Sequence, residues 1–335
     1  KDTINIALFG FGRIGRNIFR QAYKNPLFNI VAISEYSHIE TLHYLLARDS
    51  VHGVLEDEIG FEKDSFVING KKVKILPGEK PGGLNWDKFD IDFVIDATGK
   101  YLRRSDLEKH ISSGAKRVIV SSMPEDHIDR VVINGINDDE IQTSDKIISA
   151  TSSTTQVLAL MVKILDEKYS LNRAMMTTVH AFTADQPLSD AVRLDLRRSR
   201  SAVENIIPNT THAPAAVERL MPKFSGKLDG MAFNVPVPNG SCVDLTTDLK
   251  TLPNIDQVNE LMLEKSKNGL HGIVGYTEDP IVSSDVRARQ ETLVFDAKAT
   301  MITAGSLLKT ICWYDNGWGF SKRILDTIEL YNRKD

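Results

Sequence analysis

The stretch Ile4–Gly15 reads INIALFGFGRIG, a short apolar run followed by three closely spaced glycines. The run Ile4–Phe9 is typical of a buried strand, and Arg13–Tyr23 carries apolar residues at helical spacing. The glycines therefore lie between a strand and a helix. This order of elements is typical of the first part of a dinucleotide-binding βαβ unit.

Each glycine of this G-x-G-x-x-G motif has a separate physical task. Gly10 permits a tight turn, Gly12 lets the backbone approach a pyrophosphate, and Gly15 lets the helix pack close to the strand. The following helix starts with Arg13 and Ile14. Its first backbone amides and the positive end of its dipole point at the phosphates of the dinucleotide. Glycine-rich strand ends are common, so the motif needs a second signal.

Glu35 supplies that signal. It follows the apolar strand Ile30–Ser34 and lies about 20 residues past Gly15, where an acid accepts hydrogen bonds from an adenosine ribose. A carboxylate there repels a 2′-phosphate, and residues 36–39 contain no arginine that would hold one. We therefore expect NAD rather than NADP. The alternative is an ordinary solvated glutamate after a buried strand.

The pattern of elements changes near residue 150. Before it, strands such as Phe93–Ile95 and Val118–Val120 alternate with helices, which predicts an α/β, Rossmann-type, doubly wound parallel sheet. After it, longer β-rich runs predict an α+β domain with a mixed or antiparallel sheet. These runs are Arg173–Phe182, Gly230–Val237, Cys242–Leu249 and Thr300–Tyr314, and Ser321–Tyr331 is predicted as a final helix.

Composition narrows the class of protein. Hydrophobic residues make up 41% of the 335-residue chain and charged residues 26%, which excludes wholesale disorder. The formal net charge of −4, without a long basic run, argues against nucleic-acid binding. We expect no membrane span, no metal site and, with two cysteines, a reducing cytoplasmic location. Cys242 and Cys312 are predicted as buried small hydrophobes.

Four blocks of sequence carry a resemblance to a known family. With Asn5–Arg16, Asp49–Gly53, Ala97–Gly99 and Trp313–Asn316 in this order, the chain resembles the phosphorylating glyceraldehyde-3-phosphate dehydrogenases over nearly its whole length. The superfamily includes the erythrose-4-phosphate dehydrogenases. The resemblance implies a homotetramer with an NAD-binding domain of residues 1–152, completed by the C-terminal helix 317–335, and a catalytic domain of residues 153–316.

The resemblance also implies a set of cofactor-binding residues, among which Asn316 holds the nicotinamide carboxamide. The set consists of Gly10, Gly12, Arg13, Ile14, Gly15, Glu35, Thr98, Gly99, Ser121 and Asn316. The long segment Phe182–Arg200, by the same resemblance, crosses a subunit interface beside the cofactor.

The nucleophile position departs from the family. The family motif is Ser-Asn-Ala-Ser-Cys-Thr-Thr-Asn-Cys, whereas Ser149–Val157 reads SATSSTTQV, so Ser153 stands at the cysteine. His180 matches the partner histidine. Oxidation of an aldehyde first requires a nucleophile that forms a hemiacetal, and after hydride transfer an acyl-enzyme remains for phosphate to attack. The helix that begins at Ser152 or Ser153 would stabilise a thiolate.

A serine hydroxyl ionises far above a thiol, so we expect severely reduced or absent turnover, with His180 as general base. The sequence leaves two explanations open. Ser153 is either an engineered isostere that traps a substrate complex, which we favour, or the residue of a natural paralogue with lost or altered chemistry. The native codon at position 153 decides between them.

Two anion sites follow from the resemblance. Ser152, Thr154, Arg198 and Thr211 match the site for the attacking inorganic phosphate, and such hydroxyls, amides and a guanidinium suit an oxyanion. A salt-bridged Arg198 without this role is the alternative.

The site for the substrate's phosphate keeps Thr183 but has Asn234 at the family's arginine, and His212 stands where the family has glycine. Asn234 offers neutral donors in place of a charged fork, which predicts weaker binding of the aldehyde phosphate or a changed substrate. His212 either restores some positive charge near pH 6 to 7 or fills space.

Three functions therefore compete. The first is a phosphorylating dehydrogenase of the glyceraldehyde-3-phosphate type with its nucleophile as Ser153. The second is an erythrose-4-phosphate-type dehydrogenase, which Glu35 favours. The third is a non-catalytic NAD-binding paralogue. Outside these sites we predict that His52 has a structural role in a turn and that His43, His110 and His127 are solvated.

Overall fold

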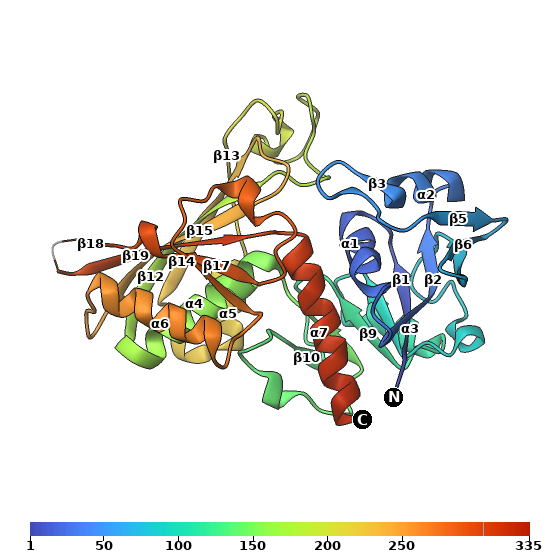
Figure 1. Ribbon diagram of the computed structural model, residues 1–335, viewed down its shortest axis with the longest axis horizontal. Helices are drawn as coiled ribbons and strands as arrows, with labels where there is room; N and C mark the ends of the chain where they lie inside the picture. Colours follow the sequence, from blue (N-terminus) through green and yellow to red (C-terminus); the bar gives the residue numbers. More distant parts are fainter. Residues whose placement is uncertain (304) are drawn as a thin grey trace. The chain divides into compact units, whose positions relative to one another are not determined.

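The computed structural model describes residues 1–303 and 305–335, which divide into two compact units. The first unit consists of Lys1–Ser152 and Ser321–Asp335, and the second of Ser153–Phe320. Each unit is built on a sheet of its own, and Figure 1 labels the strands and helices of both.

The sheet of the first unit contains six parallel strands in the order β7-β2-β1-β8-β9-β11. They are β1 (Ile4–Phe9), β2 (Phe28–Glu35), β7 (Lys71–Pro77), β8 (Phe93–Asp96), β9 (Arg117–Val120) and β11 (Ile147–Ser149). Counted along the chain this is the Rossmann strand order 3-2-1-4-5-6. The predicted parallel sheet is confirmed, and its topological switch point lies between β1 and β8.

Shorter strands extend this sheet or lie beside it. The parallel strand β10 (Arg130–Val131) continues one edge, and the antiparallel hairpin β5 (Ile59–Glu62) and β6 (Ser65–Ile68) continues the other. β3 (Arg48–Asp49) and β4 (Gly53–Val54) form a separate ribbon. It holds the predicted turn: Asp49 Oδ1 accepts hydrogen bonds from the backbone amides of Val51 and His52.

The helices of the first unit are α1 (Arg13–Ala22), α2 (Ile39–Ala47), α3 (Arg104–Ser112) and the greater part of α7 (Trp318–Lys334). Tyr331 of α7 binds this unit together. Its ring lies 6.2 Å from that of Phe93 and 5.2 Å from the Arg117 guanidinium, and its hydroxyl donates to Asp145 at 2.8 Å. Burial raises the pKa of Tyr331 above its usual range, so this donor stays protonated.

His110 corrects one prediction from the sequence. It is fully buried on the inner face of α3, one helical turn after Leu107, rather than solvated. Trp86 donates to its Nδ1 at 3.3 Å, and its Nε2 lies 3.6 Å from a carboxylate oxygen of Asp96. The Trp86 hydrogen bond offsets part of the desolvation cost of the buried ring, and Nε2 has no hydrogen-bond partner among the described residues although it faces the Asp96 carboxylate.

His43 and His127 differ in their exposure. His43 is half-buried with a ring nitrogen 2.6 Å from the Ile59 carbonyl, so the prediction was wrong there too, whereas His127 is exposed as expected.

The sheet of the second unit is mixed, as predicted, with the order β13-β14-β12-β15-β19-β17-β16. Its strands are β12 (Leu171–Ala181), β13 (Ile207–Asn209), β14 (Leu228–Val235), β15 (Ser241–Leu249), β16 (Val274–Thr277), β17 (Leu293–Asp296), β18 (Met301–Thr303) and β19 (Leu307–Tyr314). β12 pairs with β14, and β16 with β17, in parallel, while the other pairs are antiparallel.

The predicted strand Thr300–Tyr314 is in fact the antiparallel pair β18 and β19. A backbone hydrogen bond of 2.9 Å from Ser306 to Thr303 closes the turn, in which Gly305 has a φ of +66°. A glycine inside an apolar run thus permits the chain to reverse where the hydrophobic pattern continues.

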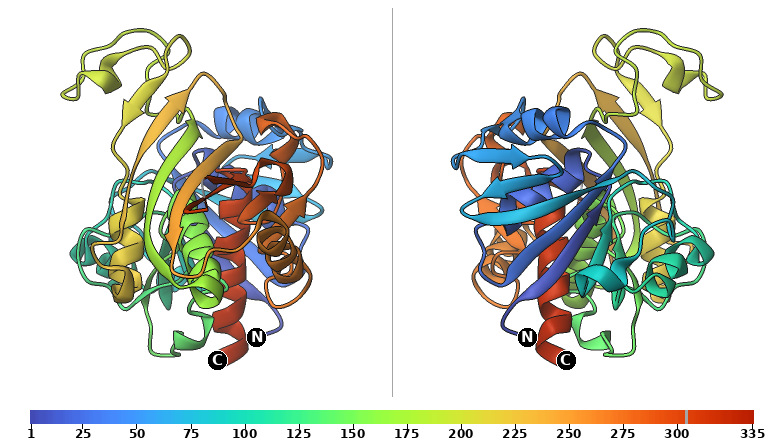
Figure 2. Two further views of the ribbon diagram at one scale, coloured as in Figure 1. Left: turned by 90° about the vertical axis from the view of Figure 1, so that its left-hand side faces the viewer. Right: turned by 90° about the vertical axis from the view of Figure 1, so that its right-hand side faces the viewer.

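Three α-helices belong wholly to the second unit: α4 (Ser153–Tyr169), α5 (Ala213–Leu220) and α6 (Ile255–Lys267). α4 is buried over most of its circumference because it packs against β12, β15 and α5, and Figure 2 shows it as the green helix beside this sheet. Short 3-10 helices are Trp86–Phe89 (η1), Asp138–Glu140 (η2), Arg197–Ser199 (η3), Pro222–Phe224 (η4), Ser283–Val286 (η5) and Ala297–Ala299 (η6).

The segment between β12 and β13 extends from the second unit with only η3 as regular structure (Figure 2, yellow). Its apolar side chains are exposed, including Leu188, Val192, Leu194 and Leu196. In the described residues, no helix has the length and apolar character needed to span a membrane.

Candidate active site

The glycine loop is built as the motif predicts. Gly10 has a φ of +94°, in the left-handed region, and a Cβ there would lie 3.1 Å from the Thr98 backbone nitrogen. A Cβ at Gly15 would lie 2.4 Å from the Gly10 carbonyl oxygen, so only glycine lets α1 start this close to β1. A Cβ at Gly12 meets nothing within 4 Å. The space before the first turn of α1 is therefore open to an anion.

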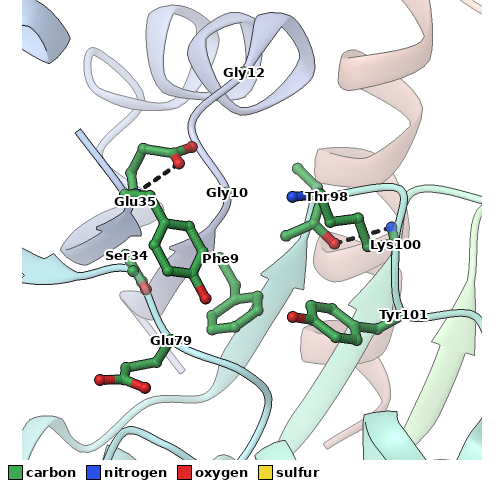
Figure 3. A pocket seen from close by; sticks show the side chains of 12 residues that line it. Phe9, Gly10, Gly12, Ser34, Glu35, Glu79, Thr98, Lys100 and Tyr101 are labelled. Carbon is green, nitrogen blue, oxygen red and sulfur yellow. Dashed lines mark hydrogen bonds between the residues drawn. The ribbon is translucent and has the colours of Figure 1, made fainter. Parts of the chain in front are cut away.

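A pocket of about 180 Å³ lies at the carboxyl ends of β1, β2 and β8, the position at which open α/β sheets bind ligands. Figure 3 shows aromatic rings from Phe9 and Tyr101 across it from the glycine loop. Its lining consists of Phe9, Gly10, Gly12, Ser34, Glu35, Tyr36, Gly78, Glu79, Ala97, Thr98, Lys100 and Tyr101. The pocket combines apolar faces with a few polar groups, as small-molecule sites commonly do.

Glu35 ends β2 and its side chain turns toward the glycine loop (Figure 3). One carboxylate oxygen accepts from the Phe11 amide at 2.7 Å and the other from the Tyr36 amide at 2.7 Å. Each oxygen has a further lone pair, so the group can still accept hydrogen bonds from a ribose. Its negative charge at the pocket disfavours a 2′-phosphate.

Asp96, which the sequence reading missed, orders the loop that carries Thr98 and Gly99. Its Oδ1 accepts from the Thr98 amide at 3.0 Å and from the Thr98 hydroxyl at 2.6 Å. The Lys100 amide then donates to the Thr98 hydroxyl at 3.2 Å. An acid as the last residue of a buried parallel strand was the available signal. The remaining candidate, Ser121, is half-buried directly after β9.

Ser153 is the first residue of α4, in the position where the helix dipole and unpaired amides favour negative charge. Thr151, two residues before it, has a φ of +60°, which is unusual for a β-branched residue. The Ser149 hydroxyl accepts from the Thr151 amide at 2.9 Å and donates to the Ser122 carbonyl at 2.7 Å. The turn before Ser153 is thus held in a strained conformation of the kind that collects at functional sites.

Tyr314 joins the start of α4 to the strand that carries His180. Its hydroxyl lies 2.8 Å from the Thr154 hydroxyl and 2.9 Å from that of Thr178. Thr178 donates to the Cys242 carbonyl at 3.1 Å, so its proton is used there. The donors therefore run from Thr154 to Tyr314, from Tyr314 to Thr178 and on to the carbonyl. Burial raises the pKa of Tyr314 to about 12, which keeps this donor protonated.

His180 lies two residues past Thr178 on β12, on the same face of the strand, and its ring centre is 6.0 Å from that of Tyr314. Its Nδ1 is 2.7 Å from the Ala181 carbonyl oxygen. A carbonyl only accepts, so Nδ1 carries the proton and Nε2 carries the lone pair of the neutral ring. In the neutral ring, Nε2 is therefore the nitrogen of His180 that can accept a proton.

Asn316 is 5% exposed and accepts from the Ser241 hydroxyl at 3.2 Å through its Oδ1. Its Nδ2 is buried without a hydrogen-bond partner among the described residues. A buried donor without a hydrogen-bond partner costs free energy. The Asn316 Nδ2 group is therefore suited to donate to an acceptor on a bound ligand. The neighbouring Asp315 holds the backbone here by accepting from the Gly317 and Trp318 amides at 2.9 Å and 2.7 Å.

The candidate anion-binding residues are distributed unevenly. The Thr211 hydroxyl accepts from the Ala213 amide at 3.2 Å at the start of α5, and the exposed His212 is the residue before that helix. The Thr183 hydroxyl donates to the carboxylate of Asp185. Half-buried Ser152 directly precedes α4. A carboxylate beside Thr183 is an unfavourable neighbour for a phosphate.

Arg198 and Asn234 are linked through Asn209, which the sequence reading also missed. Arg198 Nε donates to Asn209 Oδ1 at 3.1 Å, and Asn209 Nδ2 donates to Asn234 Oδ1 at 3.2 Å. Asn234 Nδ2 lies 3.4 Å from the Ala181 carbonyl oxygen. Arg198 Nε also lies 4.0 Å from a carboxylate oxygen of Asp195, so a long ion pair of the kind named in the alternative interpretation is present, and the phosphate role stays a prediction.

Comparison with known proteins decides the family. The family model described as "Glyceraldehyde 3-phosphate dehydrogenase, NAD binding domain" matches residues 4–104, and the C-terminal domain model matches residues 152–316. The chain is 40% identical to glyceraldehyde-3-phosphate dehydrogenase 1 of Bacillus subtilis (strain 168), over 99% of each chain. It is 41% identical to the enzyme of Priestia megaterium (strain DSM 319 / IMG 1521), over 99% of each, and 40% identical to that of Geobacillus stearothermophilus, over 97% of each.

The chain belongs to the glyceraldehyde-3-phosphate dehydrogenase family.

Membership confirms the expected cofactor as NAD. The segment matched by the NAD-binding model contains the glycine loop, Glu35 and Thr98, and these residues surround open space with amides and one carboxylate. The residues of this chain therefore fit the cofactor of its family.

Proposed function

We propose that this chain is built as an NAD-dependent phosphorylating dehydrogenase of an aldehyde phosphate, of the glyceraldehyde-3-phosphate type, with Ser153 at its nucleophile position. The observation that carries the proposal is the Tyr314 hydroxyl bridge. It fixes the start of α4, which bears Ser153, against the strand that bears His180. Separately, the hydrogen bond from His180 Nδ1 to the Ala181 carbonyl leaves the lone pair of the neutral ring on Nε2.

In this proposal residues 1–152, completed by helix 317–335, form the NAD-binding domain, and residues 153–316 form the catalytic domain. NAD, when bound, supplies the acceptor for the hydride that leaves the substrate carbon. Glu35 would hold the adenosine ribose, and the buried Nδ2 of Asn316 would donate to the nicotinamide carboxamide. The backbone amides of Arg13 and Ile14, at the start of α1, would hold the pyrophosphate. Gly10, Gly12, Gly15, Thr98, Gly99 and Ser121 would complete the site.

The chemistry of the second unit starts at Ser153. His180 Nε2 takes the proton of the Ser153 hydroxyl as the oxygen adds to the aldehyde carbon, and the hemiacetal becomes an oxyester after hydride transfer. A serine hydroxyl ionises far above a cysteine thiol, so the helix dipole cannot hold it as a resting anion. An oxyester is also a slower acyl donor to phosphate. Turnover is therefore severely reduced in this chain.

The attacking inorganic phosphate and the phosphate of the substrate would bind to different sets of side chains. Ser152, Thr154, Arg198 and Thr211 would take the attacking inorganic phosphate, with the buried Thr154 hydroxyl committed to Tyr314 and its backbone amide offered to the anion. The aldehyde phosphate would meet Thr183 and Asn234. A neutral amide replaces a guanidinium there, and Asp185 adds a negative charge, so binding of this phosphate is weak.

We further propose a homotetramer. Met175, Met231 and Leu307 of β12, β14 and β19 are 58%, 37% and 40% exposed, and the large apolar side chains Leu188, Val192, Leu194, Leu196, Val203 and Ile206 are exposed as well. Apolar surfaces of this kind are usually covered by a partner. Light scattering at micromolar concentration should give four times the chain mass, and a monomer at all concentrations would contradict the assembly.

The decisive experiment is Ser153→Cys with NADH formation followed on glyceraldehyde 3-phosphate and on erythrose 4-phosphate. A gain of about a thousandfold or more on the triose supports the proposal. Preference for the tetrose supports the erythrose-4-phosphate type, which Glu35 favours. Absence of activity on both, with NAD still bound, supports the non-catalytic paralogue. The native codon at position 153 separates an engineered from a natural serine.

A further inference from the structure

Three hydrogen bonds connect an exposed arginine to the carbonyl that holds His180. They run from Arg198 to Asn209 at 3.1 Å, from Asn209 to Asn234 at 3.2 Å and from Asn234 to the Ala181 carbonyl at 3.4 Å. The His180 Nδ1 reaches the same oxygen at 2.7 Å. We propose that Asn209 and Asn234 form a relay that makes them positioning residues for His180.

The direction of this relay is forced by its two ends. A guanidinium only donates, so Asn209 must turn its oxygen to Arg198 and its NH₂ group to Asn234. Asn234 must then turn its own NH₂ group to the Ala181 carbonyl, which only accepts. His180 Nδ1 meets that carbonyl as a donor. Every amide has one possible orientation, so the Nδ1-protonated ring is the one that fits.

The fold brings these residues together through strand register. Asn234 is the direct partner of His180 across the parallel pair of β12 and β14, and β13, which carries Asn209, pairs with the other edge of β14. Asn234 is 7% exposed. Burial of an amide costs free energy unless its donor and acceptor are both used, and the relay uses both.

The relay also changes the electrostatics of the carbonyl. An oxygen that accepts from two donors is a weaker acceptor for each, and hydrogen bonds in series polarise one another toward the positive charge of Arg198. Both effects disfavour the imidazolium form of His180 and so favour the neutral base. A base that works near neutral pH must be unprotonated there.

Other ionisable groups near His180 do not supply this effect. Tyr314 of β19 is neutral, because burial raises its pKa to about 12, and Cys312 lies two residues before it with a pKa also raised by burial. Cys242 of β15 pairs with Val179 and so faces the opposite side of the sheet. The first turn of α4 has no ionisable side chain. Among the charges of the segment between β12 and β13, Arg198 donates a hydrogen bond to Asn209. That segment carries charges of both signs, namely Asp185, Asp190, Arg193, Asp195, Arg197, Arg198, Arg200 and Glu204.

The inference rests on the proposed function for the importance of His180, but it can be tested without turnover. Histidine-labelled protein with Ser153 in place is titrated by long-range ¹H–¹⁵N NMR, and the His180 signals are those lost in His180→Gln. We expect the Nδ1-protonated tautomer in the parent. In Asn209→Leu and in Asn234→Leu the His180 titration midpoint rises by about 0.3–1 pH unit.

Three comparisons make the test specific. The double variant should rise no further than either single variant, because both break the same relay. Arg198→Met, which changes an exposed side chain and leaves the buried amides in place, should also raise the midpoint. Asn172→Leu, on the exposed end of the same strand β12, should leave it unchanged.

An Nε2-protonated parent, unchanged midpoints in Asn209→Leu and Arg198→Met, or additive effects in the double variant would each overturn the relay. In the Ser153→Cys background the acid limb of the kcat profile should move with the NMR midpoint, while the KM for NAD stays constant. If that background has no dehydrogenase activity, the proposed function fails and the NMR result still decides the relay.

Discussion

The glycine loop of the first unit and the anion-binding region of the second unit differ in how fully they keep the features expected of them. In the loop, the three glycines, Glu35 and the Asp96-held turn are all in place around open space. The second unit has the Tyr314 bridge, and the strained turn at Thr151 directly precedes this unit in the chain, whereas Ser153 and Asn234 stand at the positions proposed for the nucleophile and for the substrate's phosphate. A scaffold for chemistry can thus persist where the reacting groups have changed.

The physical reason is that cofactor binding and bond making depend on different properties of the chain. Cofactor binding needs space, amides and one carboxylate, and these come from backbone geometry that the Rossmann strand order already imposes. Bond making needs a group of particular ionisation, and one atom decides it. Loss of chemistry therefore does not predict loss of NAD binding.

The largest expected effect comes from the histidine. In the Ser153→Cys background, His180→Gln should lower kcat by roughly 10²–10⁴-fold because proton transfer loses its base. NAD affinity, measured by calorimetry, should be unchanged, which separates the two regions. The matched control is His127→Gln, an exposed histidine of the first unit, which should leave both quantities alone. Equal kcat in both variants would remove His180 from the mechanism.

Gly12→Val tests the other side of the comparison. Gly12 has a φ of −71°, which any residue adopts, and a Cβ there meets nothing, so the fold should keep its thermal stability. The valine methyls fill the space before α1, and NAD affinity should fall at least about tenfold, or ~1.4 kcal/mol. Gly15→Ala is the contrasting variant. Its Cβ would lie 2.4 Å from a backbone oxygen, so it should lower the melting temperature as well. Unchanged NAD affinity in Gly12→Val would contradict the open cradle.

The sequence predicted the first unit well because its signals are local. The strand–glycine–helix order, the acid after the second strand and the alternation of elements each need only a short window, and the sheet has the topology that they imply. His110 was wrong because its environment is not local. It is buried only because Trp86 and Asp96, from distant parts of the sequence, meet it inside the unit.

The second unit was harder to predict for the same reason. The predictions for Ser153 and His180 come from the motifs that surround them, whereas Tyr314 and Asn209 act through contacts across strands that the chain reaches much later. The register of β12 with β14, which places Asn234 beside His180, cannot be derived from either strand alone. The break between β18 and β19 was missed because the hydrophobic pattern continues through the turn.

Asn234→Arg tests whether the residue at the proposed substrate-phosphate position limits the binding of the aldehyde phosphate. A charged fork should lower the KM for the aldehyde phosphate by about tenfold in the Ser153→Cys background, since charge-assisted hydrogen bonds contribute ~1.5–3 kcal/mol and Asp185 opposes part of this. The arginine also interrupts the relay, so kcat should not rise at neutral pH. Asn234→Gln, which keeps a neutral amide, is the control. An unchanged KM in Asn234→Arg would refute the assignment of this residue to the substrate's phosphate.

Tyr314→Phe should have the smallest effect on rate. It tests whether the start of α4 and β12 keep their relative placement without the Tyr314 hydroxyl. The change leaves the Thr154 donor and a Thr178 lone pair without their buried partner, so stability should fall by ~1–2 kcal/mol and the restored kcat by roughly 2–5-fold as Ser153 and His180 lose their common anchor. The sign of the pH dependence follows from a folded-state pKa of about 12 against about 10 in the unfolded chain. The buried hydroxyl stabilises the fold below pH 10, and this contribution is lost as pH rises toward 12. Urea unfolding at pH 8 and pH 11.5 should therefore show a difference between parent and variant that narrows at the higher pH. A constant difference would mean that the pKa of the Tyr314 hydroxyl is not raised by the fold. Equal stability of parent and variant at both pH values would mean that Tyr314 acts through packing alone, and the Ser153 helix and the His180 strand would then need another explanation for their common placement.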